Sequence, residues 1–481
     1  MAQKKSIGNA LMWKLLERFG VQGSQFVLQL VLARLLDPDH YGVLSLMVIF
    51  TTLANVFIQN GFNTALIQNK DVTERDYSSV FWVTMAVAAV LYGGLFFAAP
   101  LIAKFYKMPD LVLPFRVLCL ILFPGAFNSI QLAHVSRRMD FRKVFTSNLA
   151  GMLIAGVVGI ILAVMGGGLW ALIAQQLLNV TIACMVMWFT VRWRPRFICD
   201  LNRVRVLFAY GWKLLVSGLL DAVYQDLRSL VIGKKYDSST LGHYNRGKQF
   251  PQFIINAVNT TVRSVMLPAI SSEQQDKGKV KAMMRQSITL SSYLVFPVMA
   301  GLAGVATPLV ALLLTDKWLP CVPYLQIYCF SFAFYPVHSC NLQAINAMGR
   351  SDVFLKLEII KKLVGIPLLV GAVVFFQSPV AIAMTGIITA FTSSFINAYP
   401  NKKLVGYSYL EQMKDVLPSL IASLLMFGSV WAIQLLGLGS LLTLVLQLVV
   451  GVGVYLGVSA VARLEPFMLL LQMLRSRFKK K

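Results

Sequence analysis

Long apolar stretches separated by short polar segments run through this chain of 481 residues. Most stretches reach the roughly 20 residues that an α-helix needs to cross the hydrocarbon core of a bilayer. They do not alternate between apolar and polar positions as outer-membrane strands do, and lipid cannot satisfy open strand edges. The pattern therefore predicts an all-α polytopic membrane protein with about 14 transmembrane helices. The predicted spans are 11–34, 42–67, 79–103, 111–135, 146–165, 168–191, 207–233, 242–269, 287–314, 321–346, 357–376, 379–400, 414–436 and 440–462.

Composition agrees with this class. The residues AVILMFWYC make up 57% of the chain and charged residues 13%. In soluble domains about 45–50% of residues are apolar and about 25% are charged. Intrinsic disorder is excluded because it requires low hydrophobicity. Six cysteines without a C-x-x-C pair do not form a disulfide framework. The loops between the spans are short, so any activity must be built from the helices, and we do not expect an enzyme.

The formal net charge of +24 comes from 44 Lys and Arg against 20 Asp and Glu. Thirty-one of the basic residues, with Lys361 and Lys362 among them, fall in the two termini and alternate loops, and six fall on the opposite side. Such a bias marks cytoplasmic segments, which places both termini in the cytoplasm, as the even number of spans also does. Topology thus accounts for the charge, and we expect no nucleic-acid partner. The basic C-terminal tail is expected to meet anionic membrane lipids.

Two stretches recur along the chain. The segment 37–42 (Asp to Gly) is matched by 237–242, at an offset of 200, and a second set of matches has an offset of 212. The second set pairs Phe123-Pro124, Arg138 and Asp140 with Tyr335-Pro336, Arg350 and Asp352. These repeats predict two six-helix lobes, 1–200 and 201–400, followed by two additional helices and a basic tail in 401–481. Repeated halves around a central site are usual in secondary transporters; chance recurrence of Asp and Gly at loop starts is the alternative.

Polar residues form stripes at helical spacing in the first two predicted helices of each lobe. Charged groups are costly in hydrocarbon, so a set of such stripes is expected to face a water-filled cavity. Polar pairs that merely join helices are the alternative for any single residue. The stripes contain Arg18, Gln22, Gln25 and Gln29; Asn55, Gln59 and Asn63; Ser217, Asp221, Gln225 and Arg228; and Asn256, Thr260 and Arg263, with Asn259 adjacent.

Basic residues outnumber acidic ones within the spans, which suits an anionic substrate such as a diphosphate. Gln and Asn can both donate to and accept from sugar hydroxyls. The candidate substrate-binding residues are Arg18, Gln22, Gln25, Asn63, Arg116, Gln225, Arg228, Asn259 and Arg263. The acidic residues Glu17, Asp221 and Asp226 are candidates for coupling to H⁺ or Na⁺, or they only balance the arginines.

No cofactor or bound metal is expected. The four histidines are scattered without metal-ligand spacing, and no Gly-rich phosphate loop is present. His40 and His243 are expected to be solvated in outer loops.

Several ordered motifs resemble those of the polysaccharide transporter family. They are 33–42 (ARLLDPDHYG), 60–61 and 65–68, 242–246 (GHYNR), 263–269 (RSVMLPA), and Asp316-Lys317-Trp318 before Pro323 and 325–326. This family holds the Wzx-type oligosaccharide flippases, including the colanic-acid exporter type. It belongs to the multidrug/oligosaccharidyl-lipid/polysaccharide exporter superfamily. The resemblance covers essentially the whole chain, and its specificity lies in the ordered set rather than in one motif.

The resemblance implies two six-helix lobes in a V around a central cavity that works by alternating access. It implies transport of undecaprenyl-diphosphate-linked oligosaccharide across the bacterial cytoplasmic membrane for lipopolysaccharide, capsule or exopolysaccharide. The implied partners are this lipid-linked oligosaccharide and membrane lipids. A glycan polymerase and its chain-length machinery are further candidates, and we expect a functional monomer.

Three other functions stay open. A cation-coupled multidrug antiporter of the same superfamily is disfavoured by the basic spans, because cationic drugs require net acid. A lipid II flippase would share the architecture. A membrane enzyme such as a glycan polymerase usually needs a sizeable outer loop, which this chain lacks.

Overall fold

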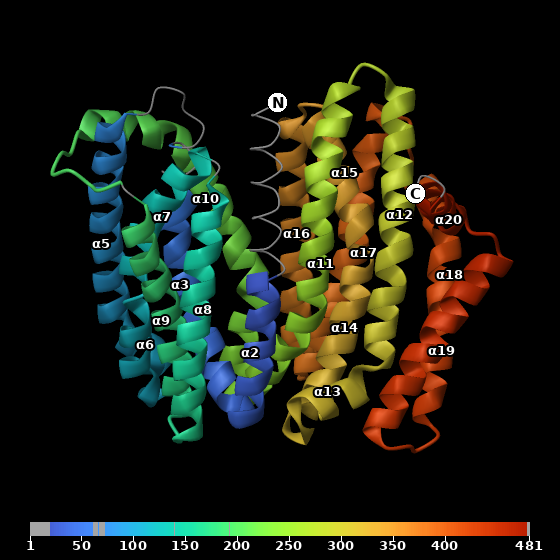
Figure 1. Ribbon diagram of the computed structural model, residues 1–481, viewed down its shortest axis with the longest axis horizontal. Coiled ribbons are helices and arrows are strands. Elements are labelled where there is room, and N and C mark those ends of the chain that lie inside the picture. The colour runs from blue at the N-terminus through green and yellow to red at the C-terminus, as the bar shows by residue number, and fades with distance from the viewer. Residues whose placement is uncertain (1–19, 61–65, 67–72, 139, 192, 479–481) are drawn as a thin grey trace. The chain divides into compact units, whose positions relative to one another are not determined.

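The computed structural model describes residues 20–60, 66, 73–138, 140–191 and 193–478, and within these ranges the regular elements are all helices (Figure 1). This confirms the all-α prediction. Among the described residues, nine helical segments are long and apolar enough to cross a membrane. The number of 14 spans stays a prediction, although described helices overlap every predicted span.

Contacts divide the chain into two compact units, Met1–Gly242 and His243–Lys481. The first contains α2 (Gln22–Leu35), α3 (Pro38–Asn60), α5 (Glu74–Tyr106), η2 (Pro109–Leu111), α6 (Val112–Cys119), α7 (Leu122–Arg137), α8 (Phe141–Val164), α9 (Leu169–Thr190), α10 (Leu201–Lys235) and the start of α11 (Ser238–Ser272). The second contains the rest of α11, α12 (Lys277–Gly304), α13 (Ala306–Leu314), η3 (Asp316–Cys321), α14 (Val322–Ala333), α15 (Tyr335–Ala347), α16 (Ser351–Phe375), α17 (Pro379–Leu404), α18 (Tyr409–Gln434), α19 (Ser440–Val461) and α20 (Glu465–Phe478).

In the first unit, α8 and α9 form a closely packed helical hairpin. Two glycines of α8 permit this approach, since small residues let helix backbones come together in membranes. A Cβ on Gly151 would lie 2.5 Å from the carbonyl oxygen of Asn179, and one on Gly159 would lie 2.9 Å from Cβ of Gln175. Helix α3 packs on α7, α9 and α10, and α10 also packs on α5.

In the second unit, α12 is the central helix and contacts α14, α15, α18 and α19. Met426 and Val430 of α18 pack with Tyr293 of α12 and Tyr455 of α19 in one buried cluster. The last two long helices are therefore part of this unit's core. The sequence predicts a separate segment, 401–481, and a repeat boundary near residue 200, and both stay predictions.

The same local geometry recurs where the sequence repeats. Helix α2 ends at Leu36, whose extended backbone donates from N–H to the carbonyl of Leu32. Two hundred residues later α10 ends at Tyr236, which is also extended and donates to Ile232. In each case an Asp follows and the next helix begins directly after it, at Pro38 or Ser238. The repeated Asp thus marks equivalent helix starts.

The C-terminal segment contains a helix that the sequence interpretation left as a basic tail. Helix α20 begins at Glu465, directly after a turn in which Arg463 has a φ of 47°. It packs on α12 and α19, with Phe467 and Leu470 against the buried cluster of α18 and α19. A Pro at the second position of a helix is compatible with its first turn, which is where Pro466 lies.

Candidate functional site

The predicted site residues of the first helix and of the segment around Asn63 are only partly described. Gln22 is exposed and Gln25 is half-buried on α2, which packs on α8. Glu17, Arg18 and Asn63 lie outside the described residues. Arg263 lies on α11, and its side chain is likewise outside the described part. The cationic excess predicted for the spans depends largely on Arg18 and Arg263.

Helix α10 carries the most complete polar stripe. Asp221, Gln225 and Arg228 lie on one face of this helix because they are spaced by four and three residues. Asp221, Asp226 and Arg228 are half-buried and Gln225 is exposed, and all four engage other groups. This described part of the stripe mixes acid and base. Such a face can bind a polar head group and can also hold an exchangeable cation.

Arg116 is held by a neighbouring helix of the first unit. Its Nε donates to the carbonyl oxygen of Phe96 at 3.2 Å, and its guanidinium lies 3.9 Å from the centroid of the Phe96 ring. Both contacts join α6 to α5. They give Arg116 a packing partner, and its role in substrate binding stays a prediction.

Asn259 joins α11 to α15 in the second unit. Its Nδ2 donates to the hydroxyl of Tyr335 at 3.4 Å, and Ser339 donates to its Oδ1 at 2.6 Å. The neighbouring stripe residues Asn256 and Thr260 are exposed. The eighth predicted span therefore has one polar residue fixed by α15 and two exposed ones.

A buried carboxamide cluster in the second unit was missed by the sequence interpretation. Asn341 of α15, Asn401 of α17 and Gln412 of α18 are each fully buried. Nδ2 of Asn401 donates to Oδ1 of Asn341 at 2.7 Å, and Asn341 donates to Oε1 of Gln412 at 2.7 Å. Nearby, Nδ2 of Asn397 lies 2.6 Å from Nδ1 of His338. The four-residue spacing of Asn397 and Asn401 is the signal in the sequence for this cluster.

The assignment of Lys361 to a cytoplasmic loop was wrong. Helix α16 begins at Ser351, and Lys361 lies ten residues inside this helix. Its side chain is 8% exposed and its Nζ lies 2.5 Å from Oε1 of Glu358, which is 22% exposed. Lys and Glu three residues apart share a helix face. An ion pair shielded from solvent in this way compensates charges that would be costly alone.

The motif residues 243–246 lie at the start of the second unit, and three of them pack in it. Tyr244 is fully buried, and its hydroxyl is hydrogen-bonded to that of Tyr328. The guanidinium of Arg246 lies over the buried Trp318 ring, and His243 meets the same ring edge-on at 5.7 Å. His243 is 8% exposed. The expectation that it is a solvated loop residue was wrong, because α11 already begins at Ser238.

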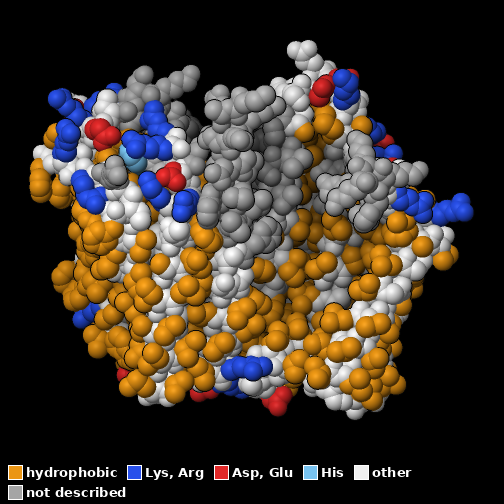
Figure 2. Space-filling model, viewed as in Figure 1, with side chains coloured by type: hydrophobic (Ala, Val, Ile, Leu, Met, Phe, Trp, Pro, Cys, Tyr) orange, Lys and Arg blue, Asp and Glu red, His pale blue; other side chains and the backbone are white. Residues whose placement is uncertain are grey.

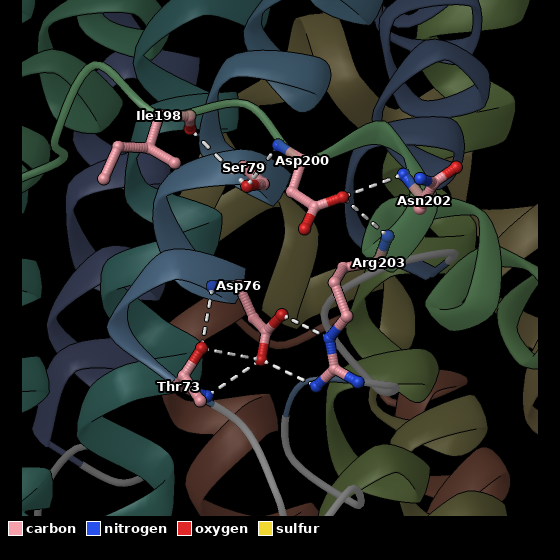
Figure 3. Close-up of polar contacts among 7 residues, drawn as sticks. All are labelled: Thr73, Asp76, Ser79, Ile198, Asp200, Asn202 and Arg203. Atoms are coloured by element: carbon pink, nitrogen blue, oxygen red, sulfur yellow. Dashed lines mark hydrogen bonds and ion pairs between the residues drawn. The ribbon is translucent and has the colours of Figure 1, made fainter.

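An ion pair ties the start of α10 to the start of α5 (Figure 3). Asp76 accepts from Arg203 at two points, Nε to Oδ1 at 2.9 Å and Nη2 to Oδ2 at 3.0 Å. The same carboxylate accepts from the backbone N–H and the hydroxyl of Thr73, which completes a capping box. A capping box satisfies N–H groups that a helix start would otherwise leave unpaired.

The segment between α9 and α10 is fixed to α5 by further hydrogen bonds. The hydroxyl of Ser78 accepts from the N–H of Arg196 at 3.1 Å, and that of Ser79 accepts from the N–H of Asp200 at 2.9 Å (Figure 3 shows the second). Nε1 of Trp82 donates to the carbonyl of Arg196 at 2.8 Å. Sequence reasoning could not identify these contacts because their partners are more than 110 residues apart.

Within the described residues, no group of three His, Cys, Asp or Glu side chains is placed to hold a metal ion. The polar groups described above can bind hydroxyls, anionic groups or a proton.

Comparison with known proteins identifies the family of the chain and proteins with a similar fold. A family model described as "Polysaccharide biosynthesis protein" matches residues 31–323. The succinoglycan biosynthesis transport protein ExoT of Rhizobium meliloti (strain 1021) is 23% identical, over 86% of this chain and 82% of its own. The lipopolysaccharide biosynthesis protein WzxC of Escherichia coli (strain K12) is 22% identical, over 88% of this chain and 87% of its own. The solved structure titled "Lipid II flippase MurJ, inward closed conformation" superposes with a TM-score of 0.74, at 14% identity, over 94% of this chain and 98% of that one.

Proposed function

Because the chain belongs to the polysaccharide biosynthesis protein family, we propose that it flips undecaprenyl-diphosphate-linked oligosaccharide repeat units across the bacterial cytoplasmic membrane. The product would supply surface polysaccharide, in the form of lipopolysaccharide, capsule or exopolysaccharide. Two observations support this: relatives along most of the chain are named for polysaccharide biosynthesis or transport, and the fold is similar to that of the solved structure titled as the lipid II flippase MurJ.

The polar helix faces meet the physical requirement of this transport reaction. A lipid-linked sugar has an apolar tail that is stable in the bilayer and a charged, hydroxylated head that is not. Polar side chains within the spans replace the hydration of the head while the tail remains in lipid. Arg228 would bind the diphosphate, because guanidinium groups pair with phosphate oxygens at two points. Gln225 and Gln25 would satisfy sugar hydroxyls.

Coupling to H⁺ or Na⁺ is proposed at Asp221 or Asp226 of α10. Their half-buried carboxylates share the helix with Arg228. An intramembrane carboxylate near a cation is a common element of proton and ion relays. Both termini are proposed to be cytoplasmic, on the charge bias of the loops.

The α10 stripe is the single observation that links the chain's own residues to this function. We would test it in a strain that lacks the gene and retains the glycan assembly genes. Wild type should restore surface glycan and clear accumulated lipid-linked repeat units. Arg228→Gln should restore less than about a tenth of this export, since one lost charge-assisted phosphate contact costs roughly 1.5–3 kcal/mol.

Lys402→Gln is the matched control, because Lys402 is an exposed basic residue at the end of α17. It should export as wild type, with equal amounts of both variants in the membrane. Normal surface glycan in the deletion strain, together with raised sensitivity to cationic drugs, would contradict the flippase and support the antiporter. Failure of peptidoglycan synthesis would instead indicate a lipid II flippase.

A further inference from the structure

The segment that joins α9 to α10 has a fixed shape. Its backbone is bound at Arg196 by Ser78 and Trp82, and at Asp200 by Ser79. The Asp76–Arg203 pair fixes the first turn of α10 that follows. A surface held at so many points is preorganised, which lowers the entropic cost of binding a ligand.

This fixed segment presents large apolar side chains outward. Phe197 is 92% exposed, although its ring stacks on that of Trp82 at 5.0 Å between centroids. Leu201, four residues later, is 67% exposed. Trp side chains such as Trp82 are enriched where a membrane protein meets the lipid head groups, and Phe and Leu side chains can be buried at the boundary with the acyl chains. Contact of Phe197 and Leu201 with lipid is favourable, whereas their contact with water is not.

The same segment is basic. Arg194, Arg196 and Arg205 are exposed, and Arg194 is held with its guanidinium 4.1 Å from the centroid of the Trp188 ring. Figure 2 shows Lys and Arg side chains gathered at one end of the first unit, above a largely hydrophobic flank. Two acidic residues nearby are already engaged: Asp76 binds Arg203, and Asp200 caps α10 by accepting from the N–H groups of residues 202 and 203.

We propose that residues 194–205, together with Trp82, form a docking surface for the head groups of anionic phospholipids in the membrane leaflet at this end of the unit. The arginines would meet the phosphates, while Phe197 and Leu201 enter the boundary with the acyl chains. An acidic protein or a nucleic acid would use the arginines and leave these apolar side chains in water. The surface does not depend on the cargo, so this proposal stands or falls separately from the proposed function.

Cys199 offers a direct probe of this surface. Of the six cysteines, Cys199 is exposed and the other five are buried. The full-length protein, labelled there with an environment-sensitive fluorophore, would be placed in nanodiscs of phosphatidylcholine alone or mixed with phosphatidylglycerol. We expect a blue shift and at least about fivefold weaker quenching by acrylamide, an uncharged quencher, with phosphatidylglycerol, which high salt reverses.

The triple variant Arg194→Gln/Arg196→Gln/Arg205→Gln should lose this response, and Phe197→Ser should lose the blue shift. The charge-matched control, Lys356→Gln/Lys402→Gln/Lys403→Gln, removes three exposed basic residues elsewhere and should respond as wild type. Lipid retention in native mass spectrometry gives a readout without the label. An unchanged probe with phosphatidylglycerol, an equal loss in the control, or the same response to inorganic phosphate alone would overturn the proposal.

Discussion

Arg203 and Asp76 form a two-point ion pair between helix starts that are 127 residues apart in sequence. The carboxylate of Asp76 is 2% exposed, whereas the side chain of Arg203 is 42% exposed. Because Thr73 donates to the same carboxylate, Asp76 both caps α5 and holds α10. Together with the hydrogen bonds at Arg196 and Asp200, this pair holds residues 196–203 against α5.

Loss of this ion pair should destabilise the first unit. Arg203→Gln leaves a largely buried carboxylate with only its Thr73 contacts, and we expect a cost of about 1–2 kcal/mol, reduced by the exposure of the arginine. The measurement is the apparent Tm of the purified protein in an uncharged detergent. Arg205 is an exposed residue near Arg203 on α10. The control Arg205→Gln should therefore leave Tm unchanged. An equal fall of Tm in both variants would contradict a stabilising role of the ion pair.

The buried carboxamide cluster makes a second prediction. Asn341→Ala removes the acceptor shared by Asn401 and Gln412, both fully buried. Each donor left unpaired in a buried site costs about 1–3 kcal/mol, so the apparent Tm should fall clearly. Asn346→Ala, on the exposed side of the same helix, is the matched control. A variant of Asn341 as stable as that control would show that the cluster does not stabilise α15, α17 and α18.

Hydropathy and residue spacing predicted those parts of the fold that depend on local sequence. The apolar helices and the all-α class follow from patterns within about 25 residues, and the equivalent helix starts after Asp37 and Asp237 follow from a match at an offset of 200 residues. The carboxamide cluster could not be predicted in the same way, because Asn341 and Gln412 are 71 positions apart and meet only through helix packing.

Errors arose where a charged or polar residue was placed by its type alone. Lys361 was assigned to a loop because basic residues usually mark loops, although Glu358, three residues earlier, was a local signal of a helical pair. His243 was assigned to solvent, although buried aromatic residues surround it. The α10 stripe was predicted from its spacing and lies on one helix, and its role as a site stays a prediction; the contacts that hold the segment before α10 were not predicted.

The Glu358–Lys361 pair should show strong coupling. Lys361→Met leaves the carboxylate of Glu358 without its partner, and we expect a loss of roughly 3 kcal/mol. Glu358→Gln should also destabilise, and the double variant should be more stable than the sum of the two predicts, by about 0.5–3 kcal/mol. Chemical denaturation in detergent measures the cycle, with the exposed Lys356→Met as control. Additive effects would mean that the two side chains do not interact.

Arg116 and Arg228 should separate stability from transport. Arg116 donates to the carbonyl of Phe96 and lies over its ring, so Arg116→Gln should lower stability by about 1–2 kcal/mol through the lost hydrogen bond and cation–π contact. If packing on Phe96 is its only role, export of lipid-linked repeat units at matched expression should remain within about twofold of wild type, a difference of only about 0.4 kcal/mol; the predicted role in substrate binding requires a larger loss. Arg228→Gln should show the opposite profile, with export reduced about tenfold and Tm little changed. The measurements are apparent Tm in detergent and export in the deletion strain. If Arg116→Gln abolishes export at full membrane abundance, then Arg116 contacts the substrate and its position against Phe96 describes only one state of the transport cycle.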